Sequence, residues 1–159
     1  VNPVALEPAI APHIAAARAG IELRAAALAD KVREQESSGA EVLLVEGAGG
    51  WLVPLNQTET MADLAALLGY PVILVVGMRL GCINHALLST QAIKTAGLQL
   101  AGWVANSMAG EMDCLAENVR TLESRLPALR LGTVPFFAEG CTPEQLNTWL
   151  DATSLFGSP

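Results

Sequence analysis

The chain has 159 residues and a formal net charge of −7, with 52% hydrophobic and only 16% charged residues. This acidic balance, without a run of lysine or arginine, argues against nucleic acid as a partner. The longest apolar runs are of strand length, so we expect no membrane span. We expect residues 1–159 to form a single α/β domain, and the apolar excess indicates faces that a partner subunit or another part of the protein covers.

The cysteine and histidine content limits which disulfides and metal sites the chain can form. Cys82, Cys114 and Cys141 are an odd number without C-x-x-C spacing, which is typical of free thiols in a reducing cytoplasm. His13 and His85 lie far apart and are not paired with cysteines at ligand spacing, so a transition-metal site is not expected.

The first half of the chain is predicted to contain helices at Ile14–Arg18, from Ile21 to about Ser37, and from Met61 to Gly69. Thr60 is the expected cap of the third helix, with Asp63 in its first turn. Four consecutive apolar residues, Val42–Val45, predict a strand buried on both faces. The stretch Trp51–Leu55 contains a proline and predicts a loop or a short edge strand.

The second half alternates between strands and helices. Strands are predicted at Pro71–Gly77, Leu100–Ala105 and Leu129–Val134. Helices are predicted at Ile83–Ala96, at Glu111–Leu126, and from a capping box at Thr142 to about Leu150. This alternation predicts a doubly wound, mostly parallel α/β sheet. Because the first strand follows two helices, we expect that the leading β-α unit is absent from these residues.

Polar residues follow three of the predicted strands. Glu46 and the glycine-rich Gly47-Ala48-Gly49-Gly50 come after the first, Arg79–Asn84 after the second, and Asn106-Ser107 after the third. The carboxyl ends of parallel strands meet at one edge, so these residues predict a ligand crevice there. Each feature also has a structural interpretation: Glu46 as a solvated cap, Gly81 and Asn84 as a turn and helix cap, and Asn106 as a turn residue.

Glu46 is the expected metal-ligating residue. Mg²⁺ takes one or two protein carboxylates together with phosphate oxygens, and glycine amides approach an anion closely. Gly81-Cys82-Ile83-Asn84 precedes a helix, where free amides favour a carboxylate or phosphate. The sequence has no G-x-x-x-x-G-K-[ST] phosphate loop. For His13, His85 and Asp63 a structural role is favoured over catalysis.

Five ordered motifs together resemble the dethiobiotin synthetase family. They are Val45–Trp51, Pro71–Gly77, Leu80–Ala86, Ala101–Asn106 and Gly132–Pro135, and the opening Val1-Asn2-Pro3 and Pro12–Ala16 resemble the family as well. The likeness runs to about Leu150 and covers the later portion of the family. It implies a P-loop NTPase-like fold in which the phosphate loop, a second Mg²⁺ carboxylate and the catalytic lysine precede Val1, so no catalytic residue is expected in this chain.

The resemblance also implies residue roles. It implies ATP- and Mg²⁺-dependent closure of a ureido ring from 7,8-diaminononanoate and CO₂, in a cytoplasmic homodimer. Glu46 would bind Mg²⁺, and Gly47, Ala48 and Gly49 would line the nucleotide and substrate. Asn106 and Ser107 would read adenine, with Pro135, Phe136 and Phe137 beside the base and Glu144 near the nucleoside. Gly81, Cys82, Ile83 and Asn84 would bind the substrate carboxylate across the dimer interface.

Two alternatives stay open at this stage. One is a related P-loop amidoligase, against which the Gly81–His85 match counts. The other is a non-catalytic fragment that only dimerises or binds nucleotide weakly, which the missing phosphate loop favours.

Overall fold

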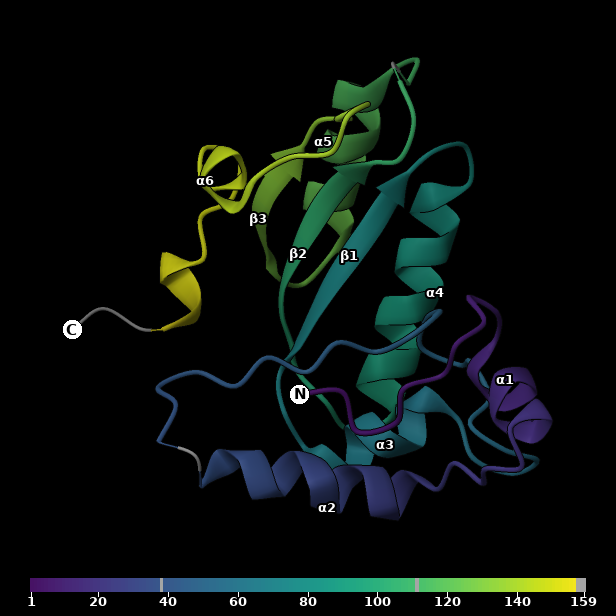
Figure 1. Cartoon of the computed structure of the whole chain (residues 1–159). Helices are drawn as coiled ribbons and strands as arrows, with labels where there is room; N and C mark the ends of the chain where they lie inside the picture. The colour runs from purple at the N-terminus through teal and green to yellow at the C-terminus, as the bar shows by residue number, and fades with distance from the viewer. Residues whose placement is uncertain (38, 111, 157–159) are drawn as a thin grey trace. The chain divides into compact units, whose positions relative to one another are not determined.

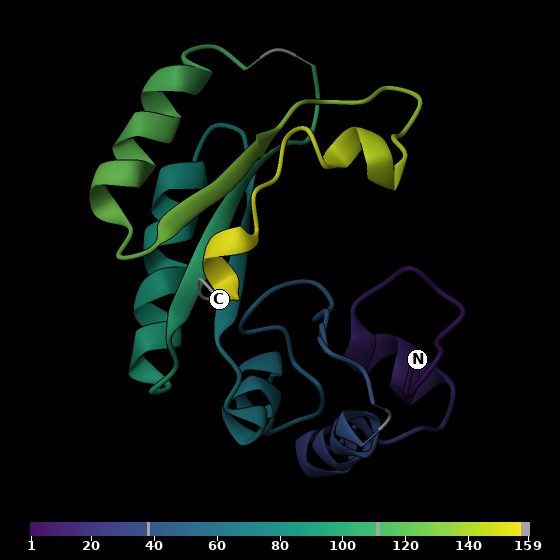
Figure 2. The same cartoon turned by 90° about the vertical axis from the view of Figure 1, so that its left-hand side faces the viewer.

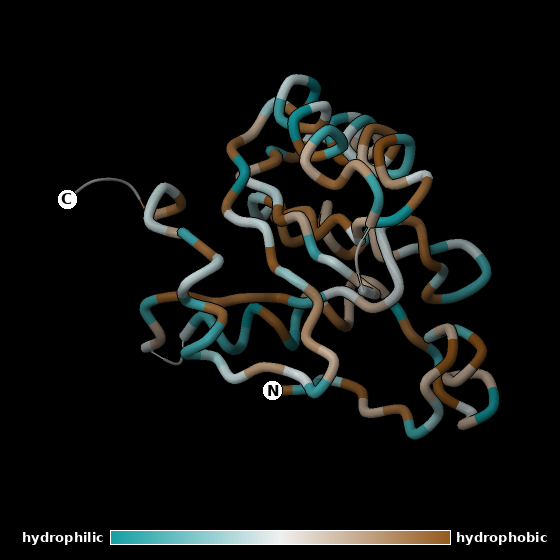
Figure 3. Tube along the Cα trace, turned by 90° about the horizontal axis from the view of Figure 1, so that it is seen from above, coloured by the Kyte–Doolittle hydropathy of each residue, from teal (hydrophilic) through white to brown (hydrophobic). Residues whose placement is uncertain are grey.

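The computed structural model describes residues 1–37, 39–110 and 112–156. These residues group into two compact units, residues 1–70 and residues 71–159, and hydrophobic stretches occur in both (Figures 1 and 3). That the whole chain acts as one domain stays a prediction. Among the described residues, no helix is both long and apolar enough to cross a bilayer.

The first unit is built on three helices, α1 (Pro12–Arg18), α2 (Ala25–Glu36) and α3 (Met61–Leu68). Its buried core contains apolar residues from α1, α2, α3 and the loops between them: Ala16, Leu23, Ala25, Ala29, Leu55 and Leu64. The predicted helices at the start of the chain are therefore present, with shifted ends.

Helix α2 begins at Ala25, four residues later than predicted. The preceding Leu23 is buried, and its carbonyl accepts a 2.7 Å hydrogen bond from the Asn56 amide. The Ala25 N–H donates to the Glu59 carboxylate at 3.3 Å. These long-range bonds hold the chain extended before Ala25 and satisfy an amide at the helix start, where intrahelical partners are missing. The helix ends at Glu36 with Ser37 as its C-cap residue, which confirms the predicted end at about Ser37.

The start of α3 is the predicted one. The Thr60 backbone N–H and hydroxyl donate to the Asp63 carboxylate at 2.6 and 2.8 Å. These bonds lower the pKa of Asp63 below its usual value, because the backbone bond from Thr60 first, and its hydroxyl second, favour the charged carboxylate. Gly69 ends the helix at φ 72°, a conformation that glycine adopts without strain.

The predicted strand Val42–Val45 is wrong. The structure has no strand over these four described residues, and the side chains are 36–79% exposed. A strand requires a neighbour for its backbone hydrogen bonds, and these residues pair with no strand of the described sheet. Farther on, a single antiparallel bridge joins Pro54 to Thr60, consistent with the predicted loop or short strand.

The second unit contains a parallel sheet. Among the described residues its order is β1 (Val72–Met78), β2 (Leu100–Ser107) and β3 (Leu129–Val134). Helix α4 (Cys82–Thr95) connects β1 to β2, and α5 (Leu115–Arg125) connects β2 to β3. The predicted α/β class with parallel strands is confirmed.

Helices α4 and α5 cover one face of this sheet, and the segment after β3 lies on the other (Figure 2). Val76 and Met78 of β1 and Trp103 and Ala105 of β2 point into the helical face, where Trp103 is completely buried. Val104 lies with Leu131 and Val134 on the opposite face. Alternate residues of each strand therefore enter alternate cores. Val75 of β1, which is an edge strand of the described sheet, stays 60% exposed and is not covered within this unit.

The last helices are shorter than predicted. Helix α5 begins at Leu115 after Cys114, which has φ 56°, and the predicted start Glu111 lies outside the described residues. The Thr142 capping box opens α6 (Pro143–Leu146), which ends before the predicted Leu150. Residue Leu150 instead forms a bridge with Gly132 of β3, and a 3₁₀ turn follows at Thr153–Leu155. Pairing with the strand edge therefore replaces the last turn of the predicted helix.

Candidate functional site

The carboxyl ends of the three strands meet at one edge of the sheet. The pairing register sets Met78 of β1 opposite Ser107 of β2, and Asn106 opposite Val134 of β3. The turn after β1, the end of β2 and the Pro135-Phe136 stretch after β3 therefore emerge side by side. This confirms the predicted convergence for the second and third polar strand ends, at the edge where open α/β sheets bind ligands.

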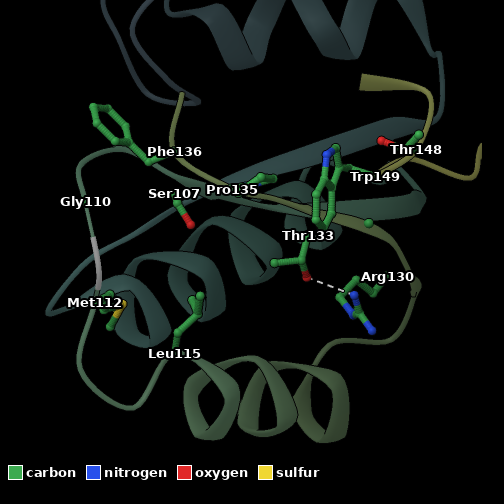
Figure 4. A pocket seen from close by; sticks show the side chains of 11 residues that line it. Ser107, Gly110, Met112, Leu115, Arg130, Thr133, Pro135, Phe136, Thr148 and Trp149 are labelled. Atoms are coloured by element: carbon green, nitrogen blue, oxygen red, sulfur yellow. Dashed lines mark hydrogen bonds between the residues drawn. The ribbon is translucent and has the colours of Figure 1, made fainter. Parts of the chain in front are cut away.

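A cavity of about 620 Å³ lies at this edge (Figure 4). Residues from three parts of the second unit line it, between the end of β2 and the start of α5, on and after β3, and after α6: Ser107, Gly110, Met112, Leu115, Arg130, Gly132, Thr133, Pro135, Phe136, Thr148 and Trp149. Its volume is within the range of sites that bind small molecules. Apolar side chains (Met112, Leu115, Pro135, Trp149) dominate its walls, with the Ser107 and Thr133 hydroxyls among them.

Arg130 is the cationic residue of this cavity. Its guanidinium donates to the Thr133 hydroxyl at 2.8 Å and to the Glu123 carboxylate of α5 at 2.7 Å. The Thr133 contact is visible in Figure 4. These two bonds orient Arg130, and Glu123 offsets its charge at this wall of the cavity.

The turn after β1 has the geometry of a helix start. Gly81 has φ 92° and is the N-cap residue of α4, so its lack of a Cβ removes the strain of this conformation. Cys82 is buried, and its thiol lies 3.9 Å from the Asn118 side-chain oxygen of α5. Asn84 and His85 are exposed on the first turn of α4. The Cys82 N–H donates to the Arg79 carbonyl at 2.9 Å and the His85 N–H to the Gly81 carbonyl at 3.1 Å. The turn therefore presents the exposed Asn84 at a helix N-terminus, a position that favours an anion.

Glu46 and its glycine-rich turn lie in the first unit. Residues Glu46 to Gly50 are exposed, with φ 82° at Gly49 and 122° at Gly50. Added side-chain atoms at Gly49 would approach Val53 to 3.0 Å. The turn therefore requires glycine. Among the described residues, no three His, Cys, Asp or Glu side chains gather as metal ligands. Glu46 itself offers an exposed carboxylate, and Mg²⁺ carried by phosphates takes one or two protein carboxylates.

The remaining predicted residues have different surroundings. Pro135 and Phe136 line the cavity, and Phe136 points away from the other labelled side chains in Figure 4. Phe137 packs against the core of Val104, Leu131 and Val134.

Asn106 is half-buried beside the cavity-lining Ser107, and its amide donates to the Met108 sulfur at 3.6 Å. Glu144 is exposed in α6, and its pKa is lowered by its own backbone N–H and by the Thr142 hydroxyl.

A second cavity, of about 640 Å³, lies within the first unit. It is lined by α1 and its following loop, from His13 to Leu23, and by Leu55 to Thr58. The Nδ1 atom of His13 is buried there without a hydrogen-bond partner among the described residues.

Comparisons with known proteins identify the family. An AAA domain family model matches residues 1–144. The chain is 56% identical over 155 residues to the ATP-dependent dethiobiotin synthetase of Pseudomonas aeruginosa strain UCBPP-PA14, covering 98% of the chain and 68% of that relative. The chain belongs to the dethiobiotin synthetase family.

Other members of the dethiobiotin synthetase family match as well. The protein of that name from Pseudomonas paraeruginosa is 61% identical over 139 residues, covering 87% of the chain and 61% of the relative. The Cellvibrio japonicus protein is 58% identical over 155 residues, covering 98% and 67%. The chain thus spans about two thirds of the length of these relatives, and the resemblance that the motifs predicted is confirmed.

Sequence reasoning missed Arg130, Thr133 and Trp149 as lining residues. Arg130 carried a signal, since it is a charged residue within a predicted strand. Trp149 carried none, because the pattern placed it in a helix and its position depends on pairing between residues about 20 apart.

Proposed function

We propose that this chain is the part of a dethiobiotin synthetase that holds the nucleoside and the substrate carboxylate. The reaction is ATP-dependent conversion of 7,8-diaminononanoate and CO₂ to dethiobiotin. The observation that carries the proposal is the 56–61% identity to relatives of that name, together with the convergence of the polar strand ends beside a cavity. A related amidoligase is disfavoured by the names of those relatives.

Chemically, the reaction joins two amines through one carbon. One substrate amine adds to CO₂ and becomes a carbamate. A carbamate oxygen attacks the γ-phosphorus of ATP, and ADP leaves. The second amine then attacks the carbamate carbon, and inorganic phosphate leaves as the ring closes. Positioning and cationic stabilisation of the phosphoryl group account for most catalysis in such transfers.

Residues of this chain bind and orient the reactants in this proposal. Asn106 and Ser107 hold the adenine edge, because an amide offers both a donor and an acceptor. Pro135 and Phe136 lie beside the base, and Glu144 lies near the nucleoside. Phe137 contributes by fixing the Pro135-Phe136 stretch, since its ring packs in the core.

In this proposal the phosphates of ATP bind at the Glu46 turn. Glu46 would hold Mg²⁺, whose charge offsets the charge of the ATP phosphates, while Gly47, Ala48 and Gly49 bring backbone amides close to nucleotide and substrate. Gly81, Cys82, Ile83 and Asn84 would bind the substrate carboxylate at the start of α4, across a homodimer interface.

The experiment is an assay of diaminononanoate-dependent ADP release with the complete enzyme, in the presence of CO₂, ATP and Mg²⁺. Glu46→Gln should lower turnover by about 100-fold, because a neutral amide is a poor Mg²⁺ ligand. Glu41→Gln is the matched control, since this exposed carboxylate lies five residues earlier in the same segment. Turnover that does not depend on the diamino acid would refute the function, and full activity of Glu46→Gln would refute the metal assignment alone.

A further inference from the structure

The cavity at the sheet edge has an aromatic wall that the family motifs do not assign. Trp149 follows α6 and is 46% exposed. Figure 4 shows its indole among the lining side chains, pointing toward Thr133. A large aromatic ring that faces a cavity instead of the core leaves a flat apolar surface available to a ligand.

The backbone around Trp149 is tied to β3. The Asp151 N–H donates to the Leu131 carbonyl at 2.7 Å, and Leu150 forms an antiparallel bridge with Gly132. On its other side, the Trp149 N–H donates to the Leu146 carbonyl of α6 at 2.9 Å. Trp149 is therefore held from both sides of the chain and is not a freely moving surface residue.

Gly132 makes this close approach possible. An added Cβ at Gly132 would collide with the Trp149 carbonyl oxygen. The strand residue that faces the segment thus has no side chain, and the indole is brought to the wall of the cavity beside Thr133.

The cavity walls other than Trp149 also suit a flat apolar ligand with a polar edge. Met112, Leu115 and Pro135 are apolar, while the Ser107 and Thr133 hydroxyls offer hydrogen bonds. A nucleobase has apolar faces and a polar edge, and bases stack well on tryptophan. The net charge of −7 disfavours a base carried on a nucleic acid.

We propose that Trp149 is a base-binding residue whose indole stacks on the adenine of the nucleotide. This inference rests on the proposed function, which supplies the nucleotide, and it extends the base site to the segment after α6. Stacking is largely indifferent to base identity, so Trp149 contributes affinity while Asn106 and Ser107 contribute selectivity.

The test is calorimetric titration of the complete enzyme with ADP, and with pyrophosphate as a probe that lacks the base. Trp149→Ala should weaken ADP binding about 5- to 150-fold, the range found for loss of one base–aromatic stack, and should leave pyrophosphate binding unchanged. Trp149→Phe should retain most of the affinity. Phe156→Ala is the control, because Phe156 is also an exposed aromatic residue after α6 but does not line the cavity.

The outcomes separate the two proposals. Wild-type protein that binds ADP, with Trp149→Ala binding it equally well, overturns the role of Trp149 and leaves the proposed function standing. Wild-type protein that binds no ADP contradicts the nucleotide site itself. If Trp149→Ala fails to fold, the fluorescence of the tryptophans is measured with and without ADP in the wild type and in Trp149→Phe. ADP should change the tryptophan emission of the wild type and leave that of Trp149→Phe unchanged. An equally large change in Trp149→Phe overturns the proposal.

Discussion

Two apolar runs of nearly the same composition differ in structure: one is a paired strand, and the other is not a strand. Val72–Val76 lies within β1, pairs with β2 and contributes Val76 to a buried core. Val42–Val45 pairs with no strand among the described residues, and Leu44 is 79% exposed. An apolar pattern therefore specifies a strand only together with a neighbour that takes up its backbone hydrogen bonds.

The largest expected effect concerns the paired region. Trp103→Ala should lower the free energy of unfolding of the second unit by about 3–5 kcal/mol, because it opens a large cavity in a completely buried site. Chemical denaturation monitored by circular dichroism measures this loss. Trp103→Phe is the control: the indole Nε1 has no partner among the described residues, so no hydrogen bond is lost and the cost should be smaller. Equal losses for both variants would contradict this packing.

The second prediction concerns the pairing of the segment after α6 with the edge of β3. Gly132→Ala should cost about 1–3 kcal/mol, because its Cβ collides with the Trp149 carbonyl and forces the segment away from the strand. Hydrogen exchange at the Asp151 amide, which is bonded to Leu131, should become faster. Gly110→Ala is the matched control, since its Cβ meets nothing within 4 Å. Unchanged exchange in Gly132→Ala would mean that the segment does not pair with β3.

The third prediction concerns the first unit, where a local cap stabilises α3. Asp63→Asn should cost about 0.5–1 kcal/mol near pH 7, since it weakens the capping box. The folded pKa of Asp63 lies below its usual 3.8, so this stabilisation is present above about pH 4 and is lost as the pH falls through the folded pKa.

Thermal unfolding of both proteins across pH measures that difference, which should disappear in strong acid. Asp30→Asn is the control, because the exposed Asp30–Arg33 ion pair at 3.4 Å contributes little. A difference between wild type and Asp63→Asn that grows on acidification would contradict the role of the cap.

The smallest expected effect concerns the unpaired run Val42–Val45. Leu44→Asp should change the free energy of unfolding by less than about 0.5 kcal/mol, because the side chain is already in solvent. The equivalent Val76→Asp, at a site only 5% exposed, should prevent folding of its unit. A severe loss of stability in Leu44→Asp would mean that residues 42–45 are a buried strand after all.

Local patterns predicted most of the second unit. The apolar runs at residues 72–76, 100–105 and 129–134 became the three described strands, and Gly69 and Gly81 bound α3 and α4 as expected. The delayed start of α2 and the early end of α6 were not predictable, since both depend on partners far along the chain: Asn56 and Glu59 for the first, β3 for the second.

The same distinction applies to the site. The sequence pointed to Arg79–Asn84 and Asn106-Ser107 because strand order alone brings strand ends to one edge. It did not point to Trp149, because no periodicity indicates that a residue after a short helix will return to a strand. Residues positioned by the sheet were predictable, and residues positioned by tertiary pairing were not.

Hydrogen exchange of the protein with and without ADP tests most directly the claim that the sheet edge of the second unit binds the nucleotide base. We expect protection at Ser107, at residues 130–136 and at Thr148-Trp149, with no change around the His13 cavity of the first unit. Protection at residues 13–23 and 55–58 instead, with none at the sheet edge, would contradict it.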